Sequence, residues 1–376
     1  MPDFPSNERD DGTAFVISNK AYCGTGLQTG WIPSNDFYSF DMNTDTWNTI
    51  SSLPTGTERQ YASGFSNDHY GFIFGGVNGS NHFNDLWMYD TATGNWQAKT
   101  SLPSSGRMGM CCFVINDTAY IIGGRTSSTN PINEVWAYSI TNDTWVRKSD
   151  LPFGSRWRAA ATAQNNKGYL IFGRDENNRY CKELLEYNPI SDSWTQISVF
   201  PNSGRSYAAL KSIAGDLVLL AGLDTLGNSY NDMWLINTTS LVWQELLPIP
   251  ALGRRGGMCF NNSSSIYYTT GTDQTNTRIK ETWKVNNPTG ISEKQKVEKI
   301  NCYPNPADQF IYLSINENNT SDISIEITDL MGQSVQKTIT NNKDMEVNTS
   351  ELSNGYYYIR VLTAKHTYYS KVNVLH

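Results

Sequence analysis

A fixed period runs through the first three quarters of the chain. Six prolines stand 49 residues apart, and each follows a hydrophobic residue: Pro5, Pro54, Pro103, Pro152, Pro201 and Pro250. An arginine follows each proline after a short gap: Arg9, Arg59, Arg107, Arg156, Arg205 and Arg254. A period of this size is typical of an array in which each unit packs only against its neighbours. The sequence therefore predicts a repeat domain over most of its length.

Each unit has the pattern of four short strands. A segment of small and apolar residues follows the arginine, and a strand that ends in glycine comes next, as in YIIGG at residues 120–124. A third apolar segment begins after an acidic residue, and a turn leads to a tryptophan in a fourth: Trp47, Trp96, Trp145, Trp194 and Trp243. Four strands in about 50 residues, the second ending in glycine, predict one blade of a β-propeller.

The glycine pairs Gly75-Gly76 and Gly123-Gly124, the Tyr/Trp pair downstream and the spacing resemble the kelch repeat family. The resemblance covers about residues 4–287. Six second strands end in glycine, at Gly26, Gly76, Gly124, Gly173, Gly222 and Gly271. We therefore expect an all-β fold in which residues 1–287 form a six-bladed kelch-type β-propeller, followed by a linker over residues 288–299.

The sixth blade lacks part of the pattern. A sixth outer-strand tryptophan would fall near Ser292, where the chain is polar instead. A propeller must close its ring or leave an open sheet edge, and the N-terminus usually supplies the missing strand. We expect the outer strand of the last blade to be missing from this chain and the chain to be truncated at its N-terminus.

The period stops near Val297, and a different alternation begins. The segments Tyr303-Pro304-Asn305-Pro306, Asp329-Leu330 with Gly332, Leu352 with Gly355-Tyr356, and Lys371-Val372 resemble the C-terminal sorting domain of the type IX secretion system of Bacteroidota. The resemblance covers residues 300–376. It implies a small Ig-like β-sandwich, the type IX machinery as a partner, and a secreted or cell-surface protein. Such cargo needs a signal peptide, and its absence near Met1 is a second reason to expect truncation.

Composition excludes several functions. The net charge of −7 leaves no basic surplus for a nucleic acid. No apolar run approaches the roughly 18 residues that a transmembrane segment needs. The six cysteines form no Cys-x-x-Cys pair, and only His69 and His82 lie in the propeller. We therefore expect no metal and no cofactor.

The six repeat arginines have two interpretations. Because two of the connections in each blade lie on one face of a propeller, these arginines are expected around the mouth of the central channel. Guanidinium groups there would bind carboxylate or sulfate. Six acids, however, recur with the same period: Asp36, Asp85, Glu134, Glu183, Asp232 and Glu281. The alternative is therefore one structural ion pair in each blade.

Residues that break the repeat are stronger site candidates because the architecture does not explain them. They lie in the same connections: Trp31, His82, Trp157, Arg158, Arg174, Asp175, Tyr180 and Asp273. Aromatic and polar groups around a concave mouth suit a sugar, which stacks one face and hydrogen-bonds its edges. A glycan or protein ligand at the mouth is the leading expectation.

Three functions remain open. The first is an exported carbohydrate- or protein-binding module without catalysis. The second is a sugar mutarotase or epimerase similar to the six-bladed kelch N-acetylneuraminate epimerases, with Asp175 or Asp273 moving the proton. The third is a spacer whose partners contact its outer rims. A mouth carboxylate with a raised pKa would favour the enzyme, and ion-paired carboxylates would favour the binder.

Overall fold

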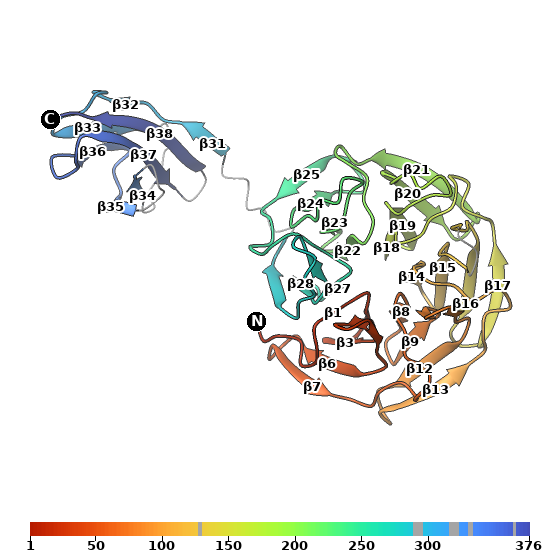
Figure 1. Cartoon of the computed structure of the whole chain (residues 1–376). Helices are drawn as coiled ribbons and strands as arrows, with labels where there is room; N and C mark the ends of the chain where they lie inside the picture. Colours follow the sequence, from red (N-terminus) through yellow and green to blue (C-terminus); the bar gives the residue numbers. More distant parts are fainter. Residues whose placement is uncertain (127–129, 289–295, 316–322, 330–333, 364–365) are drawn as a thin grey trace. The chain divides into compact units, whose positions relative to one another are not determined.

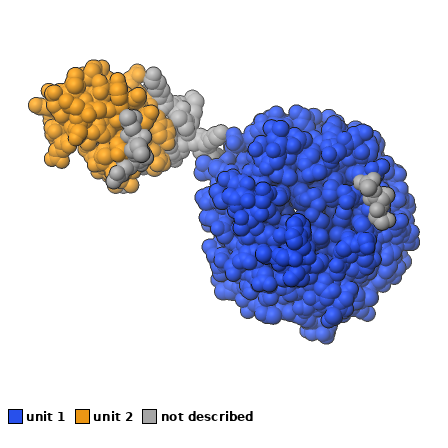
Figure 2. Space-filling model, viewed as in Figure 1, with its two compact units in different colours: residues 1–289 blue, residues 290–376 orange. Residues whose placement is uncertain are grey.

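The computed structural model describes residues 1–126, 130–288, 296–315, 323–329, 334–363 and 366–376. All the regular secondary structure of these residues is β-strand, which confirms the all-β fold class. The chain divides into two compact units, residues 1–289 and 290–376 (Figure 2). Among the described residues, no helix has the length and apolar character that crossing a membrane requires.

The first unit is a ring of six antiparallel sheets, seen end-on in Figure 1. Each blade runs outward from the axis in chain order. Blade one has β2 (Thr13–Ile17), β3 (Lys20–Gly24), β6 (Phe37–Asp41) and β7 (Thr46–Thr49); blade two has β8 (Ser63–Ser66), β9 (Tyr70–Phe74), β12 (Leu86–Asp90) and β13 (Asn95–Lys99). Blade three has β14 (Cys111–Ile115), β15 (Thr118–Ile122), β16 (Val135–Ser139) and β17 (Thr144–Lys148); blade four has β18 (Ala160–Gln164), β19 (Lys167–Ile171), β20 (Glu183–Asn188) and β21 (Ser193–Val199). Blade five has β22 (Ala209–Ile213), β23 (Asp216–Leu220), β24 (Met233–Ile236) and β25 (Trp243–Leu246); blade six has β27 (Met258–Asn261), β28 (Ser265–Thr269) and β30 (Thr282–Asn286).

Short strands pair the connections at one face of the ring. They are β1 (Arg9–Asp10) with β4 (Leu27–Gln28) and β5 (Ile32–Pro33), β10 (Val77–Asn78) with β11 (Asn81–His82), and β26 (Arg254–Arg255) with β29 (Thr272–Asp273). In every blade, the residue after the repeat arginine pairs with the loop that follows the second strand. This pairing fixes the loops that form the mouth.

Aromatic side chains fill the space between blades. In four blades a phenylalanine of the innermost strand stacks on an aromatic ring of the second strand, as Phe15 does on Tyr22 at 5.0 Å. The outer-strand tryptophans close the same clusters: Trp96 lies 5.0 Å from Tyr89. Each such ring removes a large apolar area from water, so the blades hold one another through these contacts.

The N-terminal residues complete the junction between the last blade and the first. The Phe4 amide donates to the Lys280 carbonyl at 2.8 Å, as the Leu53 amide donates to Asn35 at 2.9 Å in the next junction. The Trp47 indole donates to the Pro2 carbonyl at 3.3 Å, the counterpart of Trp96 to Ser51. The described part of blade six has three strands. The position near Ser292 and much of the predicted 288–299 linker lie outside the described residues, and N-terminal truncation stays a prediction.

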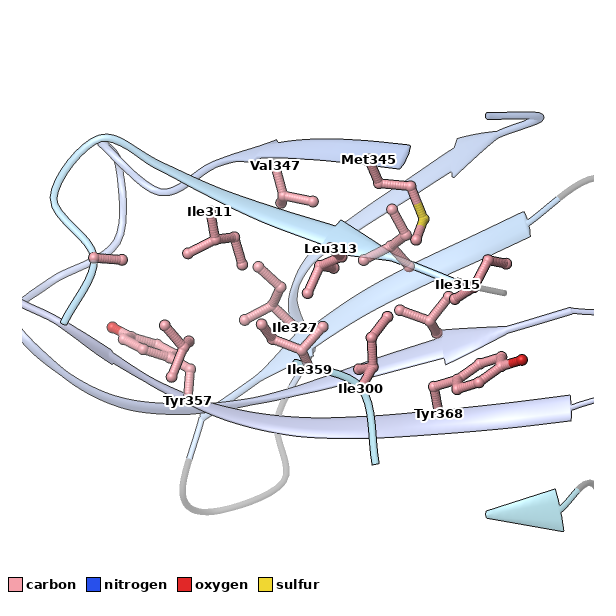
Figure 3. Close-up of a cluster of buried hydrophobic side chains, with 14 of the residues drawn as sticks. Ile300, Ile311, Leu313, Ile315, Ile327, Met345, Val347, Tyr357, Ile359 and Tyr368 are labelled. Carbon is pink, nitrogen blue, oxygen red and sulfur yellow. The ribbon is translucent and has the colours of Figure 1, made fainter. Parts of the chain in front are cut away.

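The second unit is a β-sandwich (Figure 3). One sheet has the order β31 (Lys296–Lys299), β38 (His366–Val374), β37 (Gly355–Leu362), β34 (Ile323–Thr328) and β35 (Ser334–Thr340). The other has β32 (Cys302–Tyr303), β33 (Phe310–Ser314) and β36 (Asp344–Asn348). Side chains alternate between core and solvent along β33, β34 and β36, as a half-buried strand requires. The motif residues Leu330 and Gly332 lie outside the described residues.

Candidate functional site

Six residues, one from each blade, meet around the propeller axis. Each stands two positions after a repeat arginine: Asp11, Tyr61, Gly109, Arg158, Tyr207 and Gly256. All six have left-handed backbones, with φ between 57° and 65°. Five backbone hydrogen bonds of 2.6–3.1 Å join successive residues around the circle, from Gly256 and Asp11 to Tyr207. We call these six residues the axial ring.

A left-handed backbone conformation raises the free energy of any residue that has a side chain. It therefore persists only where the surrounding structure holds it. Asp11, Tyr61, Arg158 and Tyr207 all carry this cost. Backbone strain of this kind is concentrated at functional sites, and the axial ring places four such side chains together.

The side chains of the axial ring form one cluster. The Arg158 guanidinium lies 4.4 Å from the centre of the Tyr61 ring and 4.0 Å from that of Tyr207. Asp11 stands three blades away, on the opposite side of the ring. The remaining two members are glycines, and a cavity of about 150 Å³ lies between the six.

Asp11 is a buried carboxyl group at this cavity, only 7% exposed. Burial, and secondarily the charge of Asp10, raises the pKa of Asp11 from 3.8 to about 7. Arg158, the Tyr61 hydroxyl and Arg255 act in the opposite direction but do not cancel the effect of burial. Asp11 therefore changes its charge near neutral pH, which lets it take up or release a proton there.

Three arginines surround Trp157 beside the axial ring. Their guanidinium carbons lie 3.8 Å (Arg158), 4.6 Å (Arg125) and 5.8 Å (Arg174) from the centre of a Trp157 ring. The Nε atom of each is buried without a hydrogen-bond partner, and none of the three forms an ion pair within the described ranges. Burial and the nearby cations Arg174 and Arg125 lower the pKa of Arg158. We call Arg125, Arg158 and Arg174 the arginine cluster.

The six repeat arginines are placed differently from the expected open ring. Each is at most 1% exposed and forms an ion pair with the acid of its own blade. Arg59 to Asp85 (2.6 Å) and Arg107 to Glu134 (2.8 Å) are examples. Their guanidinium groups also donate to backbone carbonyls, as Arg59 does to Gly75. These six side chains belong to the framework and present no surface to a ligand, so the alternative interpretation describes their geometry.

The predicted acids Asp175 and Asp273 fix loops. One carboxylate oxygen of Asp175 accepts the amides of Asn177 and Arg179, and Asp273 accepts those of Thr275 and Thr277 in the same way. Although burial alone would raise both pKa values, the Arg179 side chain and the two amides lower that of Asp175, and the Thr275 hydroxyl and its two amides lower that of Asp273. Neither carboxylate has the raised pKa of a proton donor.

The remaining candidates divide between the cluster and the rim. Tyr180 stacks on Arg174 at 4.4 Å and so joins the arginine cluster. Trp31 is 77% exposed and lies 4.9 Å from Arg278 beside the first and last blades. His82 ends the β10–β11 hairpin, where its Nδ1 lies 3.2 Å from the Ser80 carbonyl. The structure thus brings Trp157, Arg158, Arg174 and Tyr180 together. A ligand-binding role for Trp31 and His82 stays a prediction.

Sequence reasoning missed Asp11, Tyr61 and Tyr207. The signal was nevertheless present, because the position two residues after each arginine reads Asp, Tyr, Gly, Arg, Tyr and Gly while the positions around it repeat. A variable residue in a constant frame is the repeat-breaking pattern that identified Arg158. As for metals, the described residues hold no group of three His, Cys, Asp or Glu side chains placed to bind one.

Comparisons with known proteins agree with this architecture. The family model described as the KLHDC2/KLHL20/DRC7 Kelch-repeats domain matches residues 3–153 and 109–318. The model described as the secretion system C-terminal sorting domain matches residues 301–374. These matches confirm both resemblances found in the sequence. A solved structure titled "Structure of YjhT" matches with a TM-score of 0.65 and 17% identity, over 75% of this chain and 95% of that chain, and supports the fold alone. No curated protein matched the chain.

Proposed function

The chain belongs to the KLHDC2/KLHL20/DRC7 Kelch-repeats family and carries a type IX sorting tail, and on this premise we propose that it is an exported propeller that binds a carboxylate-bearing sugar. The binding site is the mouth formed by the arginine cluster, Trp157 and the axial ring. The sorting tail delivers this mouth to the cell surface or the medium.

The observation that carries the proposal is the unpaired charge of the arginine cluster. Each of the six repeat arginines has its own acid, whereas Arg125, Arg158 and Arg174 are half-buried around one tryptophan and form no ion pair within the described residues. The Nε atom of each cluster arginine is buried without a hydrogen-bond partner, and unpaired charge partly removed from water is costly. A ligand carboxylate compensates this cost, because its two oxygens match the donor geometry of a guanidinium group.

A sugar ring fits the other groups of the mouth. Tyr61 and Tyr207 are half-buried aromatic rings beside Arg158, and the neighbouring guanidinium groups offer hydrogen-bond donors at their edges. Sugars are recognised by this combination of stacking and polar edge contacts. An acidic sugar such as N-acetylneuraminate, glucuronate or galacturonate therefore combines the two features the mouth presents.

The test is calorimetric titration of the full chain with these three sugars and with neutral galactose and glucose. We expect binding of at least one acidic sugar and none of the neutral ones. Replacing Arg158→Met is expected to weaken binding about 100-fold, because a charge-assisted bidentate contact contributes about 3 kcal/mol when buried. The variant Lys167→Met, whose lysine pairs with Glu186 on a blade surface, is the matched control. Equal binding of acidic and neutral sugars, or of none, would remove the proposal.

A sugar mutarotase is the second candidate, and Asp11 is the observation that favours it. Exchange between anomers needs only a proton donor and acceptor beside the ring. Asp11, with its pKa near neutrality and the Tyr61 hydroxyl beside it, has this property. Exchange NMR of N-acetylneuraminate tests it: faster anomer exchange that is lost in Asp11→Asn but not in Asp175→Asn makes the protein an enzyme. Line broadening without faster exchange makes it a binder.

A further inference from the structure

A groove lies between blades four and five, on the same face of the propeller as the arginine cluster. Connections on the mouth face enclose a space of about 690 Å³ lined by Arg179, Tyr180, Lys182, Asn202, Thr225 and Tyr230. Its lining combines aromatic rings, hydroxyl and amide groups, and cations. This chemistry resembles that of the arginine cluster and differs from that of an apolar protein-binding groove.

Tyr180 belongs to both places. Its ring lies 4.4 Å from the Arg174 guanidinium, and its backbone pairs with Arg174 in the loop. The same residue lines the groove. The groove therefore begins where the arginine cluster ends, and a ligand seated at the cluster has a continuation in one direction.

Lys182 breaks a structural repeat at this groove. Four blades have asparagine at the equivalent position, and in three of them its amide donates to a carbonyl at the start of the next blade: Asn35, Asn84 and Asn231. Lysine at 182 cannot be explained by that role. Its side chain is exposed and forms no ion pair among the residues described here.

The neighbouring cation is neutralised, in contrast. Arg179 pairs with Asp175 at 2.9 Å and with Glu183 at 2.8 Å. Lys182 is therefore the free positive charge of the groove. A second acidic group of a ligand would find its partner there.

Tyr230 gives the groove a fixed aromatic surface. Its hydroxyl donates to Asp224 at 2.8 Å, and the Arg205 guanidinium lies 3.8 Å from the centre of its ring. Because two contacts hold the ring before any ligand arrives, stacking on it costs little conformational entropy. A second sugar residue could therefore stack there without ordering the protein.

We propose that the ligand is a chain of acidic sugars, with one carboxylate at the arginine cluster and the next residue in the groove beside Lys182. This inference rests on the proposed function and adds the length and charge pattern of the ligand. Each sugar unit would present one carboxylate to one cation. The aromatic rings of Tyr180 and Tyr230 would pack against the linkages between the units.

Calorimetric titration of the full chain with monomers, dimers and trimers tests the inference. Two series are used, α2,8-linked N-acetylneuraminate and α1,4-linked galacturonate. We expect the dimer or trimer of one series to bind about tenfold more tightly than its monomer, a difference of about 1.4 kcal/mol. In Lys182→Gln this gain should shrink to about twofold while monomer affinity stays unchanged.

The matched control is Lys280→Gln, which changes the lysine at the equivalent position of blade six. Lys280 lies 3.9 Å from Glu8 and away from the groove, so its loss should leave the length dependence intact. A monomer that binds as tightly as its oligomers would overturn the inference and leave the proposed function standing. Failure of every monomer and oligomer to bind would instead overturn the proposed function.

Discussion

The axial ring is one position of the repeat at which the architecture of the blade does not fix the side chain. The repeat arginine two residues earlier is constant and buried, whereas the ring position carries Asp11, Tyr61, Arg158 and Tyr207 in a backbone conformation that glycine would adopt without cost. The frame is held by the hydrogen bonds between blades, so the side chains are free to vary. Chemistry at the axis is therefore a matter of which side chains occupy this one position.

Two aspartates are expected to affect stability with opposite signs. Because the pKa of Asp11 is raised from 3.8 to about 7, the unfolded chain loses this proton first and stability falls as pH rises between those values. Asp11→Asn should therefore raise the melting temperature by about 3 °C at about pH 8 and leave it unchanged at about pH 4. Thermal unfolding followed by circular dichroism measures these melting temperatures.

Asp175→Asn supplies the contrast. The pKa of Asp175 is lowered by Arg179 and two backbone amides. The ionised carboxylate therefore stabilises the fold above the ordinary pKa of an aspartate, and this stabilisation is lost as pH falls. This variant should lower the melting temperature at neutral pH and lose that effect in acid. If both variants shifted stability in the same direction across pH, the assignment of a buried, neutral Asp11 would be wrong.

Sugar binding should depend on the same proton. Above about pH 7 the ionised Asp11 competes with a ligand carboxylate for Arg158. We expect affinity for the acidic sugar to fall about fivefold from about pH 6 to about pH 8. Titration calorimetry at both pH values measures this change, and Asp11→Asn should abolish it. An affinity that rises with pH would contradict the account.

At the scale of the blade, much could be predicted from sequence because most signals occur five or six times. The spacing of prolines, glycines and tryptophans predicted four strands in each unit, and the parallel recurrence of arginine and acid raised the ion-pair alternative. What the pattern could not decide was whether those arginines face the mouth or the blade interior. That depends on side-chain direction, which a period does not encode.

The ion pair of each blade should stabilise the propeller in proportion to how deeply its acid is buried. The acid side chain is 28% exposed in the Arg59–Asp85 pair and 55% exposed in the Arg254–Glu281 pair. Arg59→Met should cost about 3–5 kcal/mol because it leaves the Asp85 carboxylate without its cationic partner. Arg254→Met should cost clearly less, since water already solvates Glu281. Urea unfolding monitored by tryptophan fluorescence compares the two, and equal losses would refute the argument.

At the scale of the whole chain, the two units follow different rules. The propeller was predictable from its period, and the tail from alternating strands such as Ile323–Thr328 together with its motifs. The site was only partly predictable, because Asp11 and Arg158 lie in different blades, far apart in sequence, and only ring closure brings them to one cavity. The variable position after each arginine marks these residues in the sequence, but which of their side chains meet in one cavity depends on the closed ring.

The sorting tail should be necessary for export and dispensable for sugar binding. In a bacterium with type IX secretion, the chain fitted with a signal peptide should reach the surface or medium, and the same chain ending at residue 289 should remain in the periplasm. Immunoblots of the fractions measure this. Export of the shortened chain would contradict the role assigned to residues 301–374.

The most direct test of the central claim is a crystal structure of the full chain with N-acetylneuraminate or galacturonate bound. We predict that the sugar carboxylate lies within hydrogen-bond distance of at least two arginines of the cluster, with the sugar ring beside Tyr61 or Tyr207. A sugar bound at the outer rim, with the arginine cluster empty, would contradict it.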